Sequence, residues 1–199
     1  PAGIDVEALV PAVEPSRRWF WSDPERHARE RVRMLEAWTK IAERALESLR
    51  LVAPGLGLEI ARDFAARRRE AMALFPDALP SLERLRAEGA ALGLVTNGDA
   101  SMQRDKIERF ALAPFFDVVV IEGEFGAGKP HPAVYRDALA ALGAAPADTV
   151  MVGDNLDWDV AAPQRLGVAG VWLDRPGGGL PAGSPVRPDR TIRSLADLR

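Results

Sequence analysis

The sequence lacks cysteine altogether and has only two histidines among its 199 residues. The absence of cysteine excludes disulfide frameworks, cysteine-based zinc sites and thiol nucleophiles. Apolar residues make up 47% of the chain and charged residues 28%, which is the balance of an ordinary globular protein. A chain of this length buries a core without disulfide or metal staples.

Long apolar runs and an excess of positive charge are also missing. No stretch approaches the roughly 18 consecutive apolar residues of a membrane helix. The first ten residues, PAGIDVEALV, have neither the basic nor the apolar region of a signal peptide. The net charge is −3, from 26 basic and 29 acidic residues, so nothing indicates a nucleic-acid-binding surface. We therefore expect a cytoplasmic protein without nucleic-acid or membrane partners; its oligomeric state is not readable from the sequence.

The first 75 residues have the pattern of helices and carry no strand signals. A short helix is predicted from Val6 to Val13, and a second begins near Ser22-Asp23-Pro24-Glu25, which combines capping-box spacing with a first-turn proline. An apolar stripe at steps of four and three residues predicts continued helix, and it comprises Met34, Trp38, Ile41, Ala45 and Leu49. A further helix ends at Pro76. We interpret residues 1–75 as a separate α-helical domain.

After Pro76, short apolar segments alternate with helical ones. The predicted strands are Ala90–Val95, Phe116–Ile121, Thr149–Val152 and Val168–Leu173. The predicted helices are 78–88, 99–110, 132–142 and 158–166. This alternation predicts an α/β fold, a Rossmann-like three-layer core with a parallel sheet between helices, over residues 76–199. Residues 174–189 hold four glycines and four prolines and are expected to form a surface loop, with a mobile lid as the alternative.

Polar residues follow three successive predicted strands. They are Thr96, Asn97 and Gly98 after the first, Glu122 to Pro130 with Lys129 after the second, and Asp154, Asp157 and Asp159 after the third. Because ligands of open parallel sheets bind beyond the carboxyl ends of the strands, we expect these residues to converge on one rim. This set of residues suits the binding of a phosphate group near a divalent cation. Thr96 and Asn97 would donate hydrogen bonds to the phosphate and Lys129 would supply a positive charge, while Asp154 would bind Mg²⁺.

Each of these residues also has a structural explanation. Thr96 and Asn97 fit a helix cap or an Asx turn, and Asp154 fits a helix N-cap. Lys129 fits a solvated surface lysine, and Asp159 fits a second-shell group or a helix-start charge better than a direct metal ligand. Their position at three successive strand ends favours one shared site.

Other candidate residues favour structural roles. His131 stands between two prolines, and His27 and the run Arg67-Arg68-Arg69 lie on charged helices, so solvated or structural positions are expected. The aromatic run Trp19-Phe20-Trp21 is expected to pack within the helical domain, with a substrate-stacking platform as the alternative.

A near match to a nucleotide-binding loop is rejected. Gly123 to Lys129 has the spacing G-x-x-x-x-G-K after a strand, but Pro130 replaces the serine or threonine that binds Mg²⁺. Proline also lacks an N–H for a phosphate oxygen. A P-loop NTPase is therefore not expected.

Three segments resemble motifs of the haloacid dehalogenase-like (HAD) hydrolase superfamily. LVTNGD (Leu94–Asp99) resembles its second motif, GKPHP (Gly128–Pro132) its third, and VGDNLDWD (Val152–Asp159) its fourth. The helical first 75 residues are similar to the cap inserted after the first motif. The overall pattern is similar to phosphatases of the N-acylneuraminate-9-phosphatase or pyrimidine-nucleotidase kind.

The resemblance implies a Mg²⁺-dependent phosphatase that works through an aspartyl-phosphate. One aspartate attacks phosphorus, and a second, two residues on, protonates the leaving group and then activates water. Lys129 and Thr96 would stabilise the charge of the transferred phosphoryl group, Asp154 would hold Mg²⁺, and Asp159 would support its water shell. The cap would close over a small phosphorylated metabolite.

The first motif, D-x-D-x-[TV] at a strand end, is absent from the sequence. The only D-x-D-V is Asp157 to Val160, which belongs to the fourth motif. The absent strand is the central one of the family's sheet, so a gap is expected between its two neighbours. The chain also begins at Pro1 rather than methionine. We therefore expect an N-terminally truncated form that is inactive as it stands.

Three functions compete. The first is a phosphate-monoester hydrolase in the intact protein. The second is a 2-haloacid dehalogenase, which needs no carboxylate for Mg²⁺ and so leaves Asp154 unexplained. The third is a non-catalytic protein that binds phosphate esters, against which the retained Lys129, Asp154 and Asp159 weigh modestly.

Overall fold

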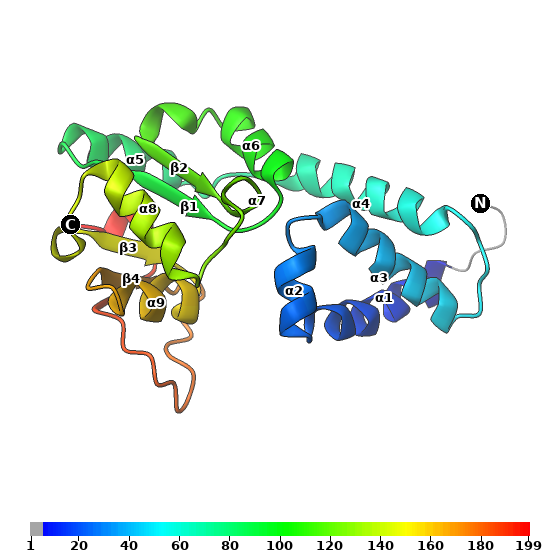
Figure 1. Cartoon of the computed structure of the whole chain (residues 1–199). Helices are drawn as coiled ribbons and strands as arrows, with labels where there is room; N and C mark the ends of the chain where they lie inside the picture. The colour runs from blue at the N-terminus through cyan, green and yellow to red at the C-terminus, as the bar shows by residue number, and fades with distance from the viewer. Residues whose placement is uncertain (1–5) are drawn as a thin grey trace. The chain divides into compact units, whose positions relative to one another are not determined.

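The computed structural model describes residues 6–199, which form two compact units (Figure 1). One unit extends to Ala73 and the other runs from Leu74 to Arg199. Within residues 6–199, no helix is long and apolar enough to cross a membrane.

The first unit is built from four helices. They are α1 (Val6–Trp21), α2 (Pro24–Glu30), α3 (Met34–Ser48) and α4 (Leu56–Ala71). The apolar stripe predicted for residues 34–49 faces the interior, since Ile41 and Ala45 of α3 are buried and Met34, Trp38 and Leu49 are half-buried. The N-cap of α2 is Asp23, whose carboxylate accepts a hydrogen bond from the Arg26 amide at 2.9 Å.

Helix α1 is twice as long as predicted and α4 ends earlier. Helix α1 continues through Pro11 and Pro15 to Trp21, because Phe20 at its end packs with Ala37 and Ile41 of α3. Tertiary packing here outweighs the helix-breaking effect of proline. Helix α4 ends at Ala71, before the predicted stop at Pro76.

The second unit alternates strands and helices, as predicted. Its strands are β1 (Gly93–Thr96), β2 (Val118–Ile121), β3 (Val150–Gly153), β4 (Ala169–Leu173) and β5 (Arg190–Ile192). Its α-helices are α5 (Ala78–Ala87), α6 (Ala100–Arg109), α7 (Glu122–Phe125), α8 (Pro132–Leu142) and α9 (Ala162–Gln164). Short 3₁₀ turns cover 113–115, 146–148 and 195–197, and a π-helix, η3, covers Leu156–Ala161.

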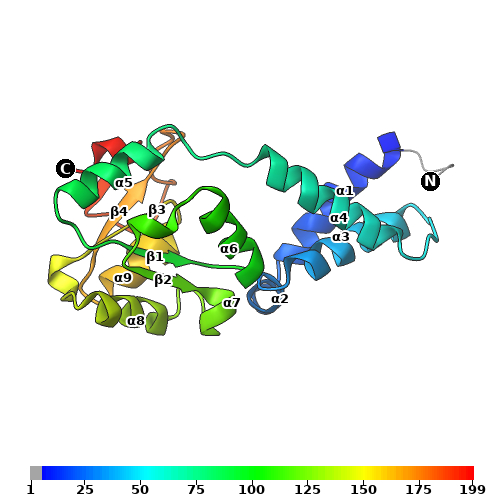
Figure 2. The ribbon, with the colours of Figure 1, turned by 90° about the horizontal axis from the view of Figure 1, so that it is seen from above.

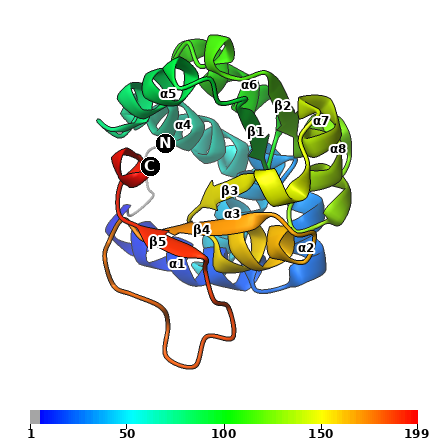
Figure 3. The ribbon, with the colours of Figure 1, turned by 90° about the vertical axis from the view of Figure 1, so that its left-hand side faces the viewer.

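All strand pairs are parallel, but the strands form two separate sheets (Figure 3). In one, β1 pairs with β2 from Gly93↔Val118 to Thr96↔Ile121. In the other, β4 lies between β3 and β5. Within the described residues, β1 has no second strand partner and β3 pairs only with β4. The single parallel sheet predicted for this unit is thus divided in two, between β1 and β3.

An apolar cavity of about 350 Å³ lies between the two sheets. It is lined by Leu94 and Val95 of β1 and by Met151 and Val152 of β3, while α5 and α8 contribute leucines from opposite sides. Figure 2 shows these two helices on either side of β1 and β2. Lys129 is among the lining residues, so the cavity reaches the segment that carries the predicted lysine.

Three local predictions for this unit need correction. The segment after β2 begins with the helical turn α7 rather than a loop. The helix predicted at 158–166 is the π-helix η3 followed by the short α9, because Asn155 caps the amides of residues 157 and 158 and starts the turn earlier. Strand β5 was not predicted, since three residues, of which only Ile192 is buried, carry too little pattern. Residues 174–189 contain neither helix nor strand.

Candidate functional site

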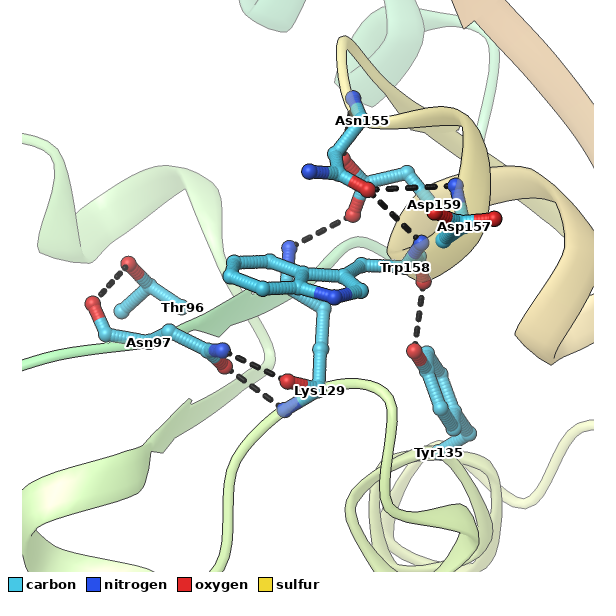
Figure 4. Close-up of polar contacts among 8 residues, drawn as sticks. All are labelled: Thr96, Asn97, Lys129, Tyr135, Asn155, Asp157, Trp158 and Asp159. Carbon is cyan, nitrogen blue, oxygen red and sulfur yellow. Dashed lines mark hydrogen bonds and ion pairs between the residues drawn. The ribbon is translucent and has the colours of Figure 1, made fainter. Parts of the chain in front are cut away.

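The carboxyl ends of β1 and β3, and the segment after β2, supply the predicted site residues (Figure 4). Thr96 is the last residue of β1, and Asn97 and Gly98 lead into α6. Lys129 lies between α7 and α8, and Asp154 directly follows β3. Hydrogen bonds connect Asn97, Lys129 and Asp159 in one continuous chain of contacts.

Asn97 holds the backbone of Lys129 with both atoms of its amide. Its Nδ2 donates to the Lys129 carbonyl and its Oδ1 accepts from the Lys129 amide, each at 2.7 Å. The two loops are therefore paired much as two neighbouring strands would be. One hydrogen of Nδ2 remains for another acceptor.

The side chain of Lys129 points to the third strand end. Its Nζ lies 2.7 Å from Oδ1 of Asp159, and the two side chains are only 13% and 4% exposed. The other oxygen of Asp159 accepts from the Asn155 amide at 3.0 Å. A buried ion pair of this kind costs desolvation and tolerates the loss of neither partner, so it orients the ammonium group firmly.

Close approach of two segments explains the glycine at the end of β3. A Cβ on Gly153 would overlap the side chain of Asp159.

The hydroxyl of Tyr135 on α8 donates to the Trp158 carbonyl in η3. Burial, together with the nearby charge of Asp159, raises the pKa of Tyr135 above its ordinary value. The hydroxyl therefore stays protonated and ties α8 to η3.

Asp154 differs from Asp159 in being exposed. Its backbone carbonyl accepts from Nε1 of Trp172 at 3.0 Å, whereas its carboxylate has no hydrogen-bond or ion-pair partner among residues 6–199. An unengaged carboxylate suits Mg²⁺, which binds one or two protein carboxylates and keeps several water ligands. No cluster of three acidic or histidine side chains that could hold a metal is found in the part of the chain that the structure describes.

The hydroxyl of Thr96 is also available. It is half-buried, and its one hydrogen bond, to the Asn97 carbonyl, is long at 3.5 Å. A contact of that length is weak, so the hydroxyl can turn to a better acceptor.

Two further residues contact the site: Glu122, which the sequence placed after the second predicted strand without giving it a role, and Gln103, which was not predicted. Glu122, 6% exposed at the end of β2, accepts from the Gly98 amide at 2.9 Å. Gln103 on α6 donates to the Asn97 carbonyl at 2.7 Å. A glutamate directly after the apolar run of β2 was the available signal for the first. Gln103 carries no such signal, although its contact with Asn97 spans only six residues.

His131, Arg67 and Phe20 occupy the structural or solvated positions expected of them, whereas Trp19 of the aromatic run is only partly packed. The ring of His131 is exposed and caps α8 by accepting from the Ala133 amide at 3.2 Å. Phe20 is buried, whereas Trp19 is 44% exposed, with Arg26 and Arg44 against its ring. Arg67 is exposed and paired with Asp63. Because α8 begins only at Pro132, Lys129 does not start a helix as it would in a P-loop.

Curated relatives of the chain are phosphatases. It is 40% identical over 146 residues to a phosphoserine phosphatase of Thermus thermophilus, covering 73% of this chain and 57% of that protein. It is 39% identical over 132 residues to the N-acylneuraminate-9-phosphatase of Homo sapiens, covering 66% and 52%. The chain thus spans about half the length of the curated relatives it matches.

Solved structures share the fold. A HAD phosphatase from Thermococcus onnurineus superposes with a TM-score of 0.60 at 28% identity, over 97% of this chain and 89% of that one. 2-Haloacid dehalogenases are also among the structures with this fold. The sequence profile of the haloacid dehalogenase-like hydrolases matches residues 6–167. The resemblance noted from three motifs is therefore confirmed, and the chain belongs to the haloacid dehalogenase-like hydrolase family.

Proposed function

We propose that the protein, in its complete form, is a Mg²⁺-dependent phosphate-monoester hydrolase that works through an aspartyl-phosphate. The observation that carries this proposal is the chain of contacts from Asn97 through Lys129 to Asp159 at the strand ends. It orients one cation firmly, and the available hydroxyl of Thr96 at the end of β1 and the unengaged carboxylate of Asp154 directly after β3 come from the neighbouring strand ends. Phosphatase relatives support the reaction class.

In this proposal the phosphoryl group is bound by Lys129, Thr96 and Asn97. The ammonium of Lys129, oriented by Asp159, would neutralise phosphoryl oxygens. The Thr96 hydroxyl and the remaining hydrogen of Asn97 Nδ2 would donate to them. Fixed donors of this kind stabilise the charge that develops during transfer, because they need no reorganisation as the reaction proceeds.

Mg²⁺ would be held by Asp154. Its exposed carboxylate fits direct coordination, whereas Asp159 is engaged by Lys129 and by the Asn155 amide and fits a supporting position behind the metal's water ligands. When bound, Mg²⁺ would supply additional positive charge for the phosphoryl oxygens.

In this proposal the nucleophile is the first aspartate of a D-x-D-x-[TV] motif at the end of a strand. Residues 1–199 contain no such motif at a strand end. The apolar cavity between β1 and β3 is lined by strand edges on both sides and by leucines of α5 and α8. A strand placed there would bring its carboxyl end to the rim that holds Lys129 and Asp154. The chain as it stands would bind ligand without turning it over.

The α-helical unit would serve as the cap, closing over a small phosphorylated metabolite. Phosphoserine and N-acylneuraminate 9-phosphate, named by the relatives, are the first substrates to assay. Arg17, Arg18, Trp19 and Trp21 are candidate contacts; both arginines lie beside Glu14. A dehalogenase would leave the unengaged Asp154 without a role, so the phosphatase is favoured.

The test compares the 199-residue chain with a longer chain that includes the coding sequence directly upstream of Pro1. We expect Mg²⁺-dependent release of phosphate from the longer chain alone, and binding of Mg²⁺ and inorganic phosphate by both. Asp154→Asn should weaken Mg²⁺ binding, measured by calorimetry, by about tenfold or more. The exposed Asp148 of the 3₁₀ turn at 146–148 gives the control, Asp148→Asn, with unchanged binding.

Turnover that persists without metal, or halide release from 2-haloacids, would contradict the proposal. Binding of phosphate esters by the longer chain with no turnover at all would favour the non-catalytic alternative.

A further inference from the structure

Glu122 is a buried carboxylate that the proposed mechanism does not use. It follows the last residue of β2 directly, is 6% exposed, and accepts from the Gly98 amide at 2.9 Å. The next residue, Gly123, donates its amide to the Gly98 carbonyl at 3.1 Å. Both backbone groups of Gly98 are therefore bound by the end of β2 and the start of α7.

The same carboxylate also lies against the lysine segment. A Cβ on Gly128 would overlap the carboxylate of Glu122, and it would lie 2.8 Å from Oδ1 of Asn97. Gly128 immediately precedes Lys129, whose amide and carbonyl are held by Asn97. Glu122 thus fills the space between the loop of Asn97 and Gly98 and the segment of Gly128 and Lys129.

Gly98 has a φ of 115°, which glycine adopts readily but other residues do not, so its two backbone hydrogen bonds are what hold this flexible residue in one conformation. The Glu122 side chain supplies the oxygen that accepts from the Gly98 amide, and an amide oxygen in the same place can accept as well. Leaving a buried carboxylate beside an anion site, in contrast, would oppose phosphate binding through its charge. Its presence is therefore explained by geometry rather than by electrostatic help.

We infer that Glu122 is a positioning residue that sets the spacing between the Asn97–Gly98 loop and Lys129, and through it the geometry of the phosphate site. Only the effect on the phosphate site rests on the proposed function, because the spacing between the loop and Lys129 does not depend on a ligand. Glu122 acts through Asn97 and Lys129 and contacts no substrate.

The first experiment measures backbone amide exchange by NMR in the ligand-free chain. In Glu122→Ala we expect the amides of Gly98 and Lys129 to exchange at least about tenfold faster than in the wild type, because both loops lose the group between them. In Glu122→Gln, which keeps an acceptor for Gly98, we expect both amides within about threefold of the wild type. Glu124→Ala is the matched control: this neighbour on α7 is exposed and pairs with Arg104, so neither amide should change.

The second experiment titrates inorganic phosphate with Mg²⁺ present, on variants shown to be fully folded by thermal melts. Glu122→Ala should weaken phosphate binding by about tenfold, with near wild-type binding in Glu122→Gln and Glu124→Ala. Rescue by glutamine is the signature of positioning.

Two results would overturn the inference. If the Gly98 amide exchanges faster in Glu122→Ala while the Lys129 amide is unchanged, Glu122 stabilises only the Asn97–Gly98 loop and does not set its spacing to Lys129. Phosphate binding by Glu122→Gln as weak as that by Glu122→Ala would show that its charge, and not its position, acts on the site. If the wild type binds no phosphate, the proposed function fails, while the exchange data still decide the role of Glu122.

Discussion

At the scale of single residues, burial separates Asp154 from Asp159, the first and last of the three aspartates in the fourth motif. Asp159 is almost fully buried and paired with Lys129, while Asp154 is exposed and unengaged among the described residues. The same residue type thus supports a lysine at one position and is available to a cation at the other. Spacing in the sequence suggested this division, and the hydrogen bonds supply its physical cause.

The Lys129–Asp159 pair leads to a stability prediction. Lys129→Met should lower the free energy of unfolding by about 3–5 kcal/mol, because it leaves the carboxylate of Asp159 buried without its partner. Adding Asp159→Asn should restore part of that loss, since the buried charge is then gone. Urea denaturation of the two single variants and the double variant measures the coupling. Additive losses would show that the pair is not coupled in the folded protein.

At the scale of elements, Asp77 ties the start of α5 to the end of the chain. Its Oδ2 accepts from Ser194 Oγ and the Leu195 amide, each at 2.7 Å, and from Arg175 at 3.1 Å. Burial alone would raise the pKa of Asp77, but hydrogen bonds from Ser194, Arg175 and Leu195 outweigh it and lower the pKa from 3.8 to about 2. The carboxylate therefore favours the folded state while it is ionised.

This pKa predicts a loss of stability in acid. The contribution of Asp77 is about 2 kcal/mol above pH 4 and disappears as the pH falls from about 4 towards 2, because the unfolded chain binds the proton first. Asp77→Asn should therefore be less stable than the wild type at pH 6, and the difference should shrink by pH 2.5. Urea midpoints at the two pH values measure it. A difference that is equal at both would show that the hydrogen bonds do not depend on charge.

The elements themselves were predicted unevenly. Helix α8 was predicted to the residue, because Pro132 and Gly143 mark its two ends. The predicted end of α1 was wrong, and so was the helix predicted at 158–166, where the structure has the π-helix η3. Contacts from α3 and hydrogen bonds to Asn155 override the local pattern there. Among the candidate site residues, position after successive strands was enough to predict that Lys129 and Asp159 lie together, whereas the pairing of Asn97 with the Lys129 backbone needed the structure.

At the scale of the whole molecule, the division of the sheet is the dominant feature of the second unit. Two parallel sheets face an apolar cavity, with unpaired edges of β1 and β3 among the described residues. Strand edges and apolar walls of this kind favour the addition of an extended segment, which satisfies backbone groups and buries apolar surface together.

A longer chain that supplies such a segment should therefore be more stable. We expect the amides of residues 93–96 and 150–153 to exchange at least about tenfold more slowly in it than in the 199-residue chain, and the binding of a hydrophobic dye to fall. Residues 190–192, on the far side of β4, are the internal control and should change little. Equal exchange at β1 and β3 in both chains would show that the added segment lies elsewhere.

The sequence alone determined the α/β class, the helical nature of the first unit and the residues at the strand ends, because periodicity and turn chemistry are local. Only the tertiary structure decided which of those residues meet. The Asn97–Lys129 pairing spans 32 positions and the Lys129–Asp159 pair spans 30, and contacts over such separations depend on strand order and packing. For the same reason Glu122 became visible as a structural link only once β1 and β2 were seen side by side.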